Sequence, residues 1–171
     1  MIIETARLYL RPVIAGDANA LYAIYGDPQT NLFNPAGPYP NLDFAQTILA
    51  GWLSQWPLHG FGHWAISLRS APAEIIGFGG LSRRKVDETR NINLGYRFST
   101  STWGKGLATE FALASLDFGF EQLKLREISA LVRENHLASR HVLEKIGMQR
   151  VGGVCEMENG VGSVVYTLCR Q

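Results

Sequence analysis

The segment STSTWGKGLATE (residues 99–110) joins a strand-like run to a long helix-forming run, with two glycines and a lysine at its centre. Glycines leave backbone N–H groups uncovered, and the first N–H groups of a helix have no partner within the helix. Because the N-terminus is also the positive end of the helix dipole, such a turn can bind a phosphate. A tight turn without a ligand would need the same glycines, so these residues alone leave both interpretations open.

Two common phosphate-binding motifs fit this segment poorly. A P-loop requires Ser or Thr after its Gly-Lys pair, but Gly106 follows Lys105, and Ser99 stands where the first glycine should be. A dinucleotide-binding motif requires GxGxxG or GxGxxA directly after a strand, but GKGLAT ends in Thr109 and begins several residues beyond the strand. Glu127 lies about 20 residues further on, as that motif would require. A nucleotide-dependent oxidoreductase therefore stays as an alternative with little support.

Around this segment, apolar periodicity predicts elements in the order β, α, α, β, β, β, α, β, α, β, β. The expected strands cover residues 7–12, 61–68, 74–82, 92–99, 126–134, 149–155 and 163–169, and the expected helices lie within 16–29, 41–56, 106–123 and 138–148. Asn41 is the expected N-cap of the second helix, and the turn ENG joins the last two strands. The sequence predicts an α/β (α+β) fold: a mixed, mostly antiparallel twisted sheet of about seven strands with about four helices on its faces.

Length and charge limit the function classes. A chain of 171 residues is expected to form a single domain, residues 1–171. With 16 basic and 15 acidic side chains, it has no strong field to recruit nucleic acid or an anionic membrane, so a small ligand is the expected partner. The N-terminal residues lack a signal-peptide pattern, which predicts a soluble, cytoplasmic protein. Cys155 and Cys169 lack CxxC spacing and are expected to be reduced thiols, with no metal site.

The glycine segment resembles motif A of the GCN5-related N-acetyltransferases (GNAT), [QR]-x-x-G-x-[GA], with Trp103, Gly106 and Ala108 at the three defined positions. The form WGKG followed by Ala-Thr-Glu is similar to the branch of the ribosomal-protein N-terminal acetyltransferases (RimJ/RimL-like). TARLYLRP resembles that branch's first strand, GHWAI and EIIGFGGL its central hairpin, NLGYRF its bulged strand, and ENHLASRHVLEKIGM motif B. The resemblance covers essentially the whole chain and implies a single GNAT-type domain.

The resemblance implies acetyl-CoA as co-substrate. Backbone N–H groups of residues 103–109 would hold its pyrophosphate, and its thioester would lie beside Leu94 to Tyr96, where Gly95 fits the family's strand bulge. Arg97 and Phe98 would offer backbone partners to the pantetheine amides, and Asn135, or His136 in its place, would contact the pantetheine. The implied binding residues are Leu94, Tyr96, Arg97, Phe98, Trp103, Gly104, Lys105, Gly106, Leu107, Ala108, Thr109, Asn135 and Ser139.

The candidate catalytic residues are Ser139, Tyr96 and His63. Some relatives carry a glutamate base three residues before the tyrosine, where this chain has Asn93. His63 is the alternative base because an imidazole titrates near neutral pH, although a packed histidine is equally compatible with the sequence. Leu143 occupies the usual position of the motif B tyrosine, so Ser139 is the available hydroxyl for the leaving thiolate; a helix cap would also explain this serine.

The implied activity is acetyl-CoA-dependent transfer of an acetyl group to a primary amine, of a protein N-terminus or a small molecule, by direct attack in a ternary complex. A non-catalytic acyl-CoA-binding module on the same fold is the alternative, because the carboxylate at Asn93 is missing. The early helices, the loop 32–41 and the ENG hairpin are expected to select the amine acceptor. A peptide N-terminus ranks first among acceptors, and a homodimer is a possible assembly.

Overall fold

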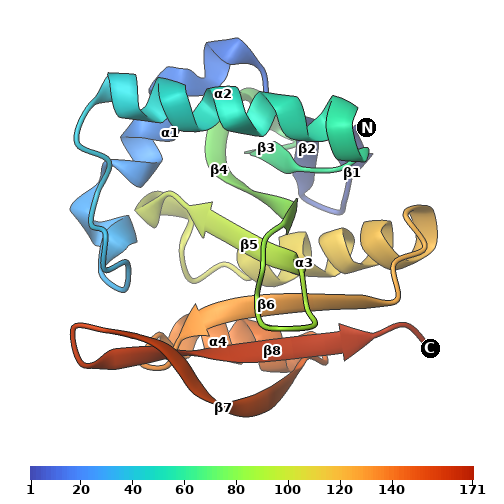
Figure 1. Ribbon diagram of the computed structural model, residues 1–171. Helices are drawn as coiled ribbons and strands as arrows, with labels where there is room; N and C mark the ends of the chain where they lie inside the picture. The colour runs from blue at the N-terminus through green and yellow to red at the C-terminus, as the bar shows by residue number, and fades with distance from the viewer. The chain divides into compact units, whose positions relative to one another are not determined.

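The computed structural model describes residues 1–171 and contains an eight-stranded sheet and four α-helices (Figure 1). Hydrogen-bonded neighbours in the sheet follow the order β1-β2-β3-β4-β5-β6-β8-β7. The strands are β1 (Ile3–Glu4), β2 (Leu8–Pro12), β3 (His63–Leu68), β4 (Ala71–Arg83), β5 (Ile92–Phe98), β6 (Glu127–Arg133), β7 (Gln149–Glu158) and β8 (Val161–Cys169). The helices are α1 (Ala18–Tyr25), α2 (Leu42–His59), α3 (Leu107–Asp117) and α4 (Leu137–Lys145). The α/β class is confirmed.

The sheet is mixed, as predicted, because β5 and β6 are parallel whereas β1–β2, β2–β3, β3–β4, β6–β8 and β7–β8 are antiparallel. One parallel pair beside five antiparallel pairs excludes a doubly wound dinucleotide-binding sheet. The strand that the sequence did not predict is β1, which pairs Ile3 with Leu10. Two residues are too few to show a hydrophobic period, so the expected number of strands was low by one.

The chain divides into two compact units, each made of two separate stretches of sequence. Unit 1 comprises Met1–Gly80 and Tyr96–Leu107, and unit 2 comprises Leu81–Gly95 and Ala108–Gln171. In unit 1, α1 and α2 lie side by side (Figure 1) and pack against strand residues Ala65 and Phe78. These buried apolar contacts form the core behind the N-terminal strands.

Helix α2 begins and ends at the residues that local chemistry dictates. The side chain of Asn41 accepts a hydrogen bond from the N–H of Phe44 at 2.8 Å, which confirms the predicted N-cap, and Gly60 ends the helix in the left-handed region. The buried face is centred on Ala45 and Leu49, whereas Phe44 is 42% exposed. None of the helices combines the length and the apolar character needed to traverse a bilayer.

In unit 2, strand β8 lies between β6 and β7, and the predicted turn between β7 and β8 is confirmed. Asn159 and Gly160 have φ values of +53° and +77°, the left-handed pair that two-residue hairpin turns require. A π-helical turn, Phe118–Gln122, continues α3. A Cβ added to Gly119 in this turn would stand 2.5 Å from Cδ1 of Ile128, so this glycine allows close packing against β6.

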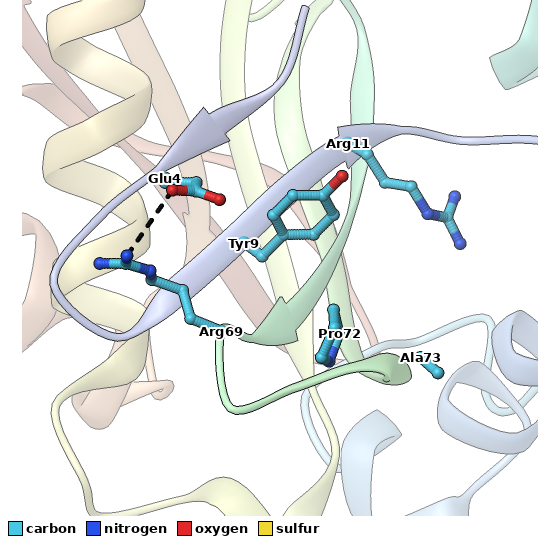
Figure 2. A pocket seen from close by; sticks show the side chains of 6 residues that line it. All are labelled: Glu4, Tyr9, Arg11, Arg69, Pro72 and Ala73. Carbon is cyan, nitrogen blue, oxygen red and sulfur yellow. Dashed lines mark ion pairs between the residues drawn. The ribbon is translucent and has the colours of Figure 1, made fainter.

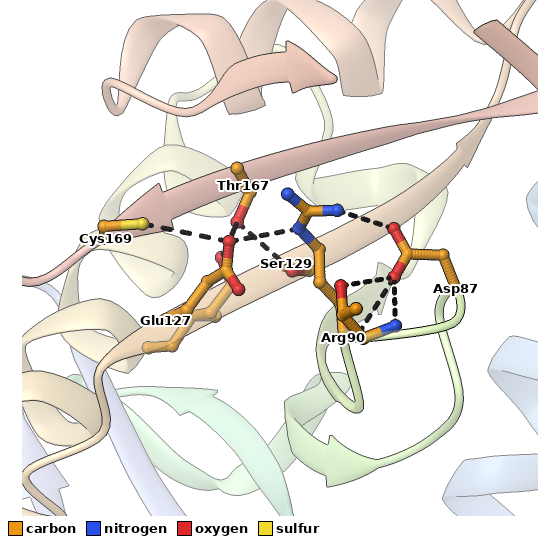
Figure 3. Close-up of polar contacts among 8 residues, drawn as sticks. Asp87, Arg90, Glu127, Ser129, Thr167 and Cys169 are labelled. Atoms are coloured by element: carbon orange, nitrogen blue, oxygen red, sulfur yellow. Dashed lines mark hydrogen bonds and ion pairs between the residues drawn. The ribbon is translucent and has the colours of Figure 1, made fainter. Parts of the chain in front are cut away.

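A polar network joins the loop after β4 to β6 and β8 within unit 2 (Figure 3). The Glu127 carboxylate accepts hydrogen bonds from Arg90 Nε at 3.0 Å and Thr167 Oγ1 at 2.6 Å, and Arg90 also pairs with Asp87. The hydrogen bond from Thr167, and then the Arg90 contact, hold the pKa of Glu127 below its usual value. Glu127 therefore has protein partners and a structural position, which removes the remaining support for Glu127 as the acidic residue of a dinucleotide-binding motif.

Candidate active site

The glycine turn that follows β5 keeps its backbone open. Gly104 and Gly106 both have a φ of +75°, and nothing lies within 4 Å of a Cβ added to Gly104. Helix α3 begins at Leu107, directly after the turn. Left-handed glycines before a helix N-terminus expose successive N–H groups, which is the arrangement that binds phosphate oxygens.

Side chains hold this turn from two directions within unit 1. Arg7 Nη1 donates a hydrogen bond to the carbonyl oxygen of Lys105 at 2.7 Å, and Arg7 Nη2 lies 3.6 Å from the position of a Cβ on Gly106. The indole N–H of Trp103 donates to the carbonyl oxygen of Phe98 at 3.0 Å, while half of that side chain is exposed. Trp103 thus stabilises the turn by a hydrogen bond, and Arg7 adds a cation that the sequence did not reveal.

Strand β5 leads into the turn and carries the predicted pantetheine-binding residues. In unit 1, a Cβ on Gly77 would lie 2.9 Å from the carbonyl oxygen of Arg97, so this glycine permits close approach of β4. In unit 2, Asn93 is buried, lies opposite Ser129, and accepts a hydrogen bond from the N–H of Leu131 at 3.1 Å through its side-chain oxygen. The residue at the family's glutamate position therefore links β5 to β6.

The side chain of Arg97 occupies a defined environment in unit 1. Its Nη1 donates a hydrogen bond to Asn31 Oδ1 at 2.8 Å, and its guanidinium carbon lies 4.4 Å from the centre of the Tyr25 ring. Tyr25 is buried, and its ring also packs at 5.3 Å from that of Tyr39. Burial raises the pKa of both tyrosines, and the charge of Arg97 opposes that shift. Nothing in the sequence places a strand arginine beside Asn31, so this environment of the Arg97 side chain could not be predicted.

His63, the candidate base, packs inside unit 1. Its ring stacks on Trp52 with the ring centres 3.8 Å apart and the planes 3° from parallel. Its Nδ1 lies 2.9 Å from Gln55 Oε1, an acceptor, which assigns the proton of the neutral imidazole to Nδ1. Desolvation lowers the pKa of His63 to about 3. At neutral pH this ring is a weak base in a packed position.

The motif B residues belong to unit 2 and lie around the start of α4. Asn135 is exposed, His136 is the N-cap residue, and Ser139 lies inside the first turn of the helix. The cap explanation for Ser139 is therefore wrong, since His136 holds that position. Leu143 is buried and packs as a core residue.

The predicted binding residues divide between the two units. Unit 1 brings together Tyr96, Arg97, Phe98, Trp103, Gly104, Lys105, Gly106 and Leu107, and it also contains His63. Unit 2 contains Leu94, Ala108, Thr109, Asn135 and Ser139. The strand end, the glycine turn and the first residue of α3 thus form one continuous stretch of a single unit.

A separate open pocket of about 570 Å³ lies in unit 1 (Figure 2). It is lined by Glu4, Tyr9, Arg11, Arg69, Pro72 and Ala73, none of which is a predicted site residue. Arg69 lies 3.7 Å from Glu4, and Arg11 donates hydrogen bonds to Asp17 at 2.9 and 2.8 Å. Both arginines of this pocket therefore have a carboxylate of the protein as partner.

Comparison with known proteins gives a family match over most of the chain. The family described as "Acetyltransferase (GNAT) domain" matches residues 7–149. An uncharacterized N-acetyltransferase, p20, from Bacillus licheniformis is 26% identical over 163 residues, which cover 95% of this chain and 90% of that protein. A crystal structure of an acetyltransferase from Agrobacterium tumefaciens is 26% identical with a TM-score of 0.83, covering 99% of this chain and 95% of the other.

Two more distant structures share the fold. The structure titled as a ribosomal-protein-serine acetyltransferase from Vibrio cholerae has a TM-score of 0.78 at 19% identity and covers 99% of this chain and 98% of its own. Spermidine N-acetyltransferase from Vibrio cholerae, in complex with CoA and spermine, has a TM-score of 0.78 at 18% identity, covering 96% of each chain.

Proposed function

Since this chain belongs to the GNAT acetyltransferase family, we propose that it transfers the acetyl group of acetyl-CoA to a primary amine by direct attack in a ternary complex. The chain is an N-acetyltransferase by family, and the acceptor and the residues that act on it are the parts we propose. We further propose that residues 1–171 form one catalytic domain, because the matched region, 7–149, includes residues of both units.

The observation that carries this proposal is the open glycine turn before α3. A pyrophosphate needs several N–H donors with no side chain in front of them, and Gly104 and Gly106 provide that exposure in the left-handed conformation. Lys105 in the turn, and Arg7 through the Lys105 carbonyl, add positive charge near the same backbone. The proposed pyrophosphate site is the backbone of Trp103 to Thr109.

The proposed place of the reaction is the strand that precedes the turn. There the amine nitrogen forms a bond to the thioester carbonyl carbon, the carbon–sulfur bond breaks, and a proton from the amine ends on the thiolate of CoA. We place the thioester beside Leu94 to Tyr96 and assign the backbone of Arg97 and Phe98 to the pantetheine amides. We assign Asn135, just before α4, to pantetheine contact, and Ser139, in the first turn of α4, to the thiolate proton.

The amine must be neutral to attack. Because the pKa of His63 is lowered to about 3, its imidazole accepts a proton poorly at neutral pH. We therefore assign His63 to the packed wall formed with Trp52 and propose that water, or the neutral fraction of the amine, replaces a protein base. This assignment fits a chain with Asn93 at the family's glutamate position.

The proposed branch is that of the ribosomal-protein N-terminal acetyltransferases, with a protein N-terminus or a small-molecule amine as acceptor and a homodimer as one expected assembly. A ribosomal-protein-serine acetyltransferase and a spermidine N-acetyltransferase share the fold at 19% and 18% identity. We assign the choice of acceptor to the early helices, the loop 32–41 and the ENG hairpin.

Isothermal titration with acetyl-CoA tests the first half of the proposal. We expect saturable binding with Kd in the micromolar range, roughly 1 μM to 1 mM. Absence of binding at high micromolar concentration would contradict it. Release of CoA with a panel of amines then separates an enzyme from a binding module, and sustained release excludes the module. NADH serves as the negative control, because binding of NADH without acetyl-CoA would favour the oxidoreductase.

A further inference from the structure

Arg97 differs from several other arginines of this chain in having no carboxylate partner. Arg11 pairs with Asp17. Arg69 pairs with Glu4 (Figure 2), and Arg90 pairs with Asp87 and Glu127 (Figure 3). The guanidinium of Arg97 instead contacts a neutral amide and an aromatic ring. The Arg97 residue is partly buried. A guanidinium that has lost part of its water and has no counterion gains from an anion that reaches it.

The groups around Arg97 hold it in one orientation. Asn31 is 5% exposed, and its side-chain NH₂ donates hydrogen bonds to the carbonyl oxygens of Tyr25 and Asp27, both at 2.8 Å. Its Oδ1 accepts from Asn34 at 3.0 Å as well as from Arg97 at 2.8 Å. Asn31 therefore cannot turn away without losing these bonds. The hydrogen bond to Asn31 occupies one of the five N–H donors of the Arg97 guanidinium. The planar fork of these donors suits a carboxylate.

The place of Arg97 connects it to the acceptor rather than to CoA. Successive side chains of a strand point to opposite faces, and Phe98 packs at Gly77 while Arg97 reaches Tyr25 of α1. Tyr39, in the loop expected to select the acceptor, packs on the same Tyr25 ring. The guanidinium thus belongs to the face formed by the early helices, one residue along β5 from the proposed thioester position.

We propose that Arg97 binds a carboxylate of the acceptor, so that the preferred substrate is an amine that also carries a carboxylate. This inference rests on the proposed acetyl transfer. The carboxylate can belong to a free amino acid or to an acidic side chain close to a peptide N-terminus, and the chemistry of recognition is the same. An acceptor with only positive charges, such as a polyamine, would be repelled by Arg97.

Matched acceptor pairs test the proposal. The first arm compares free amino acids with their carboxamides, and the second compares C-terminally amidated Ala-Glu with amidated Ala-Gln. For each pair kcat/KM is measured with the wild type, Arg97→Met and Arg97→Lys. Comparing the preference ratio between proteins cancels the different intrinsic reactivity of the two amines. We expect the carboxylate preference to fall roughly 10- to 100-fold in Arg97→Met, mainly through KM, and to be partly kept in Arg97→Lys.

Two further variants separate binding from folding and from general charge. Asn31→Asp keeps Arg97 but supplies an internal carboxylate, and we expect it also to lower the carboxylate preference. Arg69→Met removes the same charge from an exposed pair in unit 1, and we expect it to leave the preference unchanged. Thermal unfolding and acetyl-CoA titration confirm that each variant is folded.

The outcomes are distinguishable. A preference lost with Arg97 supports the inference, and the arm that shows it identifies a free amino acid or an acidic peptide. A preference equal in wild type and Arg97→Met, or turnover of polyamines in place of carboxylates, overturns it while acetyl transfer stands. Binding of acetyl-CoA with no acceptor of either arm acetylated also overturns it. Loss of acetyl-CoA binding in the wild type overturns the proposed function itself.

Discussion

Gly106 has a backbone that only glycine adopts without strain. Its φ of +75° costs a residue with a side chain roughly 1–2 kcal/mol, more for a β-branched one, and a Cβ there would lie 3.6 Å from Arg7 Nη2. The methyl groups of a valine at this position would also stand where a pyrophosphate approaches the backbone. We expect Gly106→Val to raise the Kd for acetyl-CoA about 10-fold or more, measured by isothermal titration.

Gly60→Val is the control for backbone strain. Gly60 ends α2 with a φ of +78°, and nothing lies within 4 Å of its Cβ position. The variant should lose a similar amount of stability and bind acetyl-CoA normally. Normal binding by Gly106→Val would mean that the pyrophosphate lies elsewhere.

Individual side chains were the least predictable part of the site. The sequence places a histidine next to Trp64, but the residues that pack against His63, Trp52 and Gln55, come from a helix that precedes it in the chain. Burial, which lowers the pKa of His63, could therefore not be foreseen from its sequence neighbours. Asn93 was recognised only as a missing carboxylate, because its hydrogen bond to Leu131 depends on the register of two strands that are distant in sequence.

The turn and the start of β2 depend on each other through Arg7. This residue directly precedes β2, and its hydrogen bond to Lys105 connects the N-terminal strands to the glycine turn 98 positions further along the chain. We expect Arg7→Met to loosen the turn and raise the KM for acetyl-CoA roughly 3- to 10-fold, with a smaller change in kcat, measured by steady-state kinetics.

Arg7→Lys keeps the charge without the planar fork and should recover part of the loss. Arg69→Met is the matched control, since it removes a cation of unit 1 that pairs with Glu4. Equal effects of Arg7→Met and Arg69→Met would assign the change to net charge instead of the turn.

The network around Glu127 stabilises the contact of β6 with β8 and with the loop before β5. The pKa of Glu127 is lowered, so the ionised form contributes stability above the ordinary glutamate pKa of about 4.3, and this stability is lost as the pH falls through the lower value in the folded protein. Glu127 is partly exposed, so we expect Glu127→Gln to cost about 1 kcal/mol or less at pH 7.

Urea unfolding at pH 7 and at pH values below about 4 measures this difference. The difference in the free energy of unfolding between wild type and Glu127→Gln should become smaller at acidic pH, because the wild-type carboxyl is then protonated. If this difference in the free energy of unfolding is the same at both pH values, packing and not the charge of Glu127 causes the loss of stability.

Helices and strands were predicted where local signals are strong. The N-cap at Asn41 and the Asn159–Gly160 turn both depend on residues that are adjacent in sequence. The buried face of α2, centred on Ala45 and Leu49, has no such local signal, because periodicity alone does not decide which side meets the sheet. The short β1 and the π-helical turn after α3 have no local signal, since pairing and packing create them.

The stability of the whole protein is expected to depend on His63 below neutral pH. The unfolded histidine binds a proton below about pH 6.5, whereas the folded one has a pKa of about 3. The contribution of neutral, packed His63 to the stability of the folded protein is therefore complete above about pH 6.5 and is lost as the pH falls towards about 3. We expect the free energy of unfolding to decrease by up to about 1.4 kcal/mol per pH unit in that range.

Urea unfolding across about pH 4 to 7, which covers the upper part of that window, measures this slope, and NMR titration of the His63 ring shows whether His63 causes it. The ring resonances should not titrate between about pH 5 and 8. A His63 signal that titrates near pH 6.5 would contradict both the packed position and the pH dependence.

The division of the chain into two interleaved units has a consequence for its synthesis on the ribosome. Unit 1 needs residues up to Leu107, and the first stretch of unit 2, Leu81–Gly95, emerges before unit 1 is complete. Unit 1 therefore cannot finish folding before the first stretch of unit 2 has emerged, and that stretch must wait for its partners until residues 108–171 are translated. Release of a chain truncated after residue 95 should yield a species that chaperones bind.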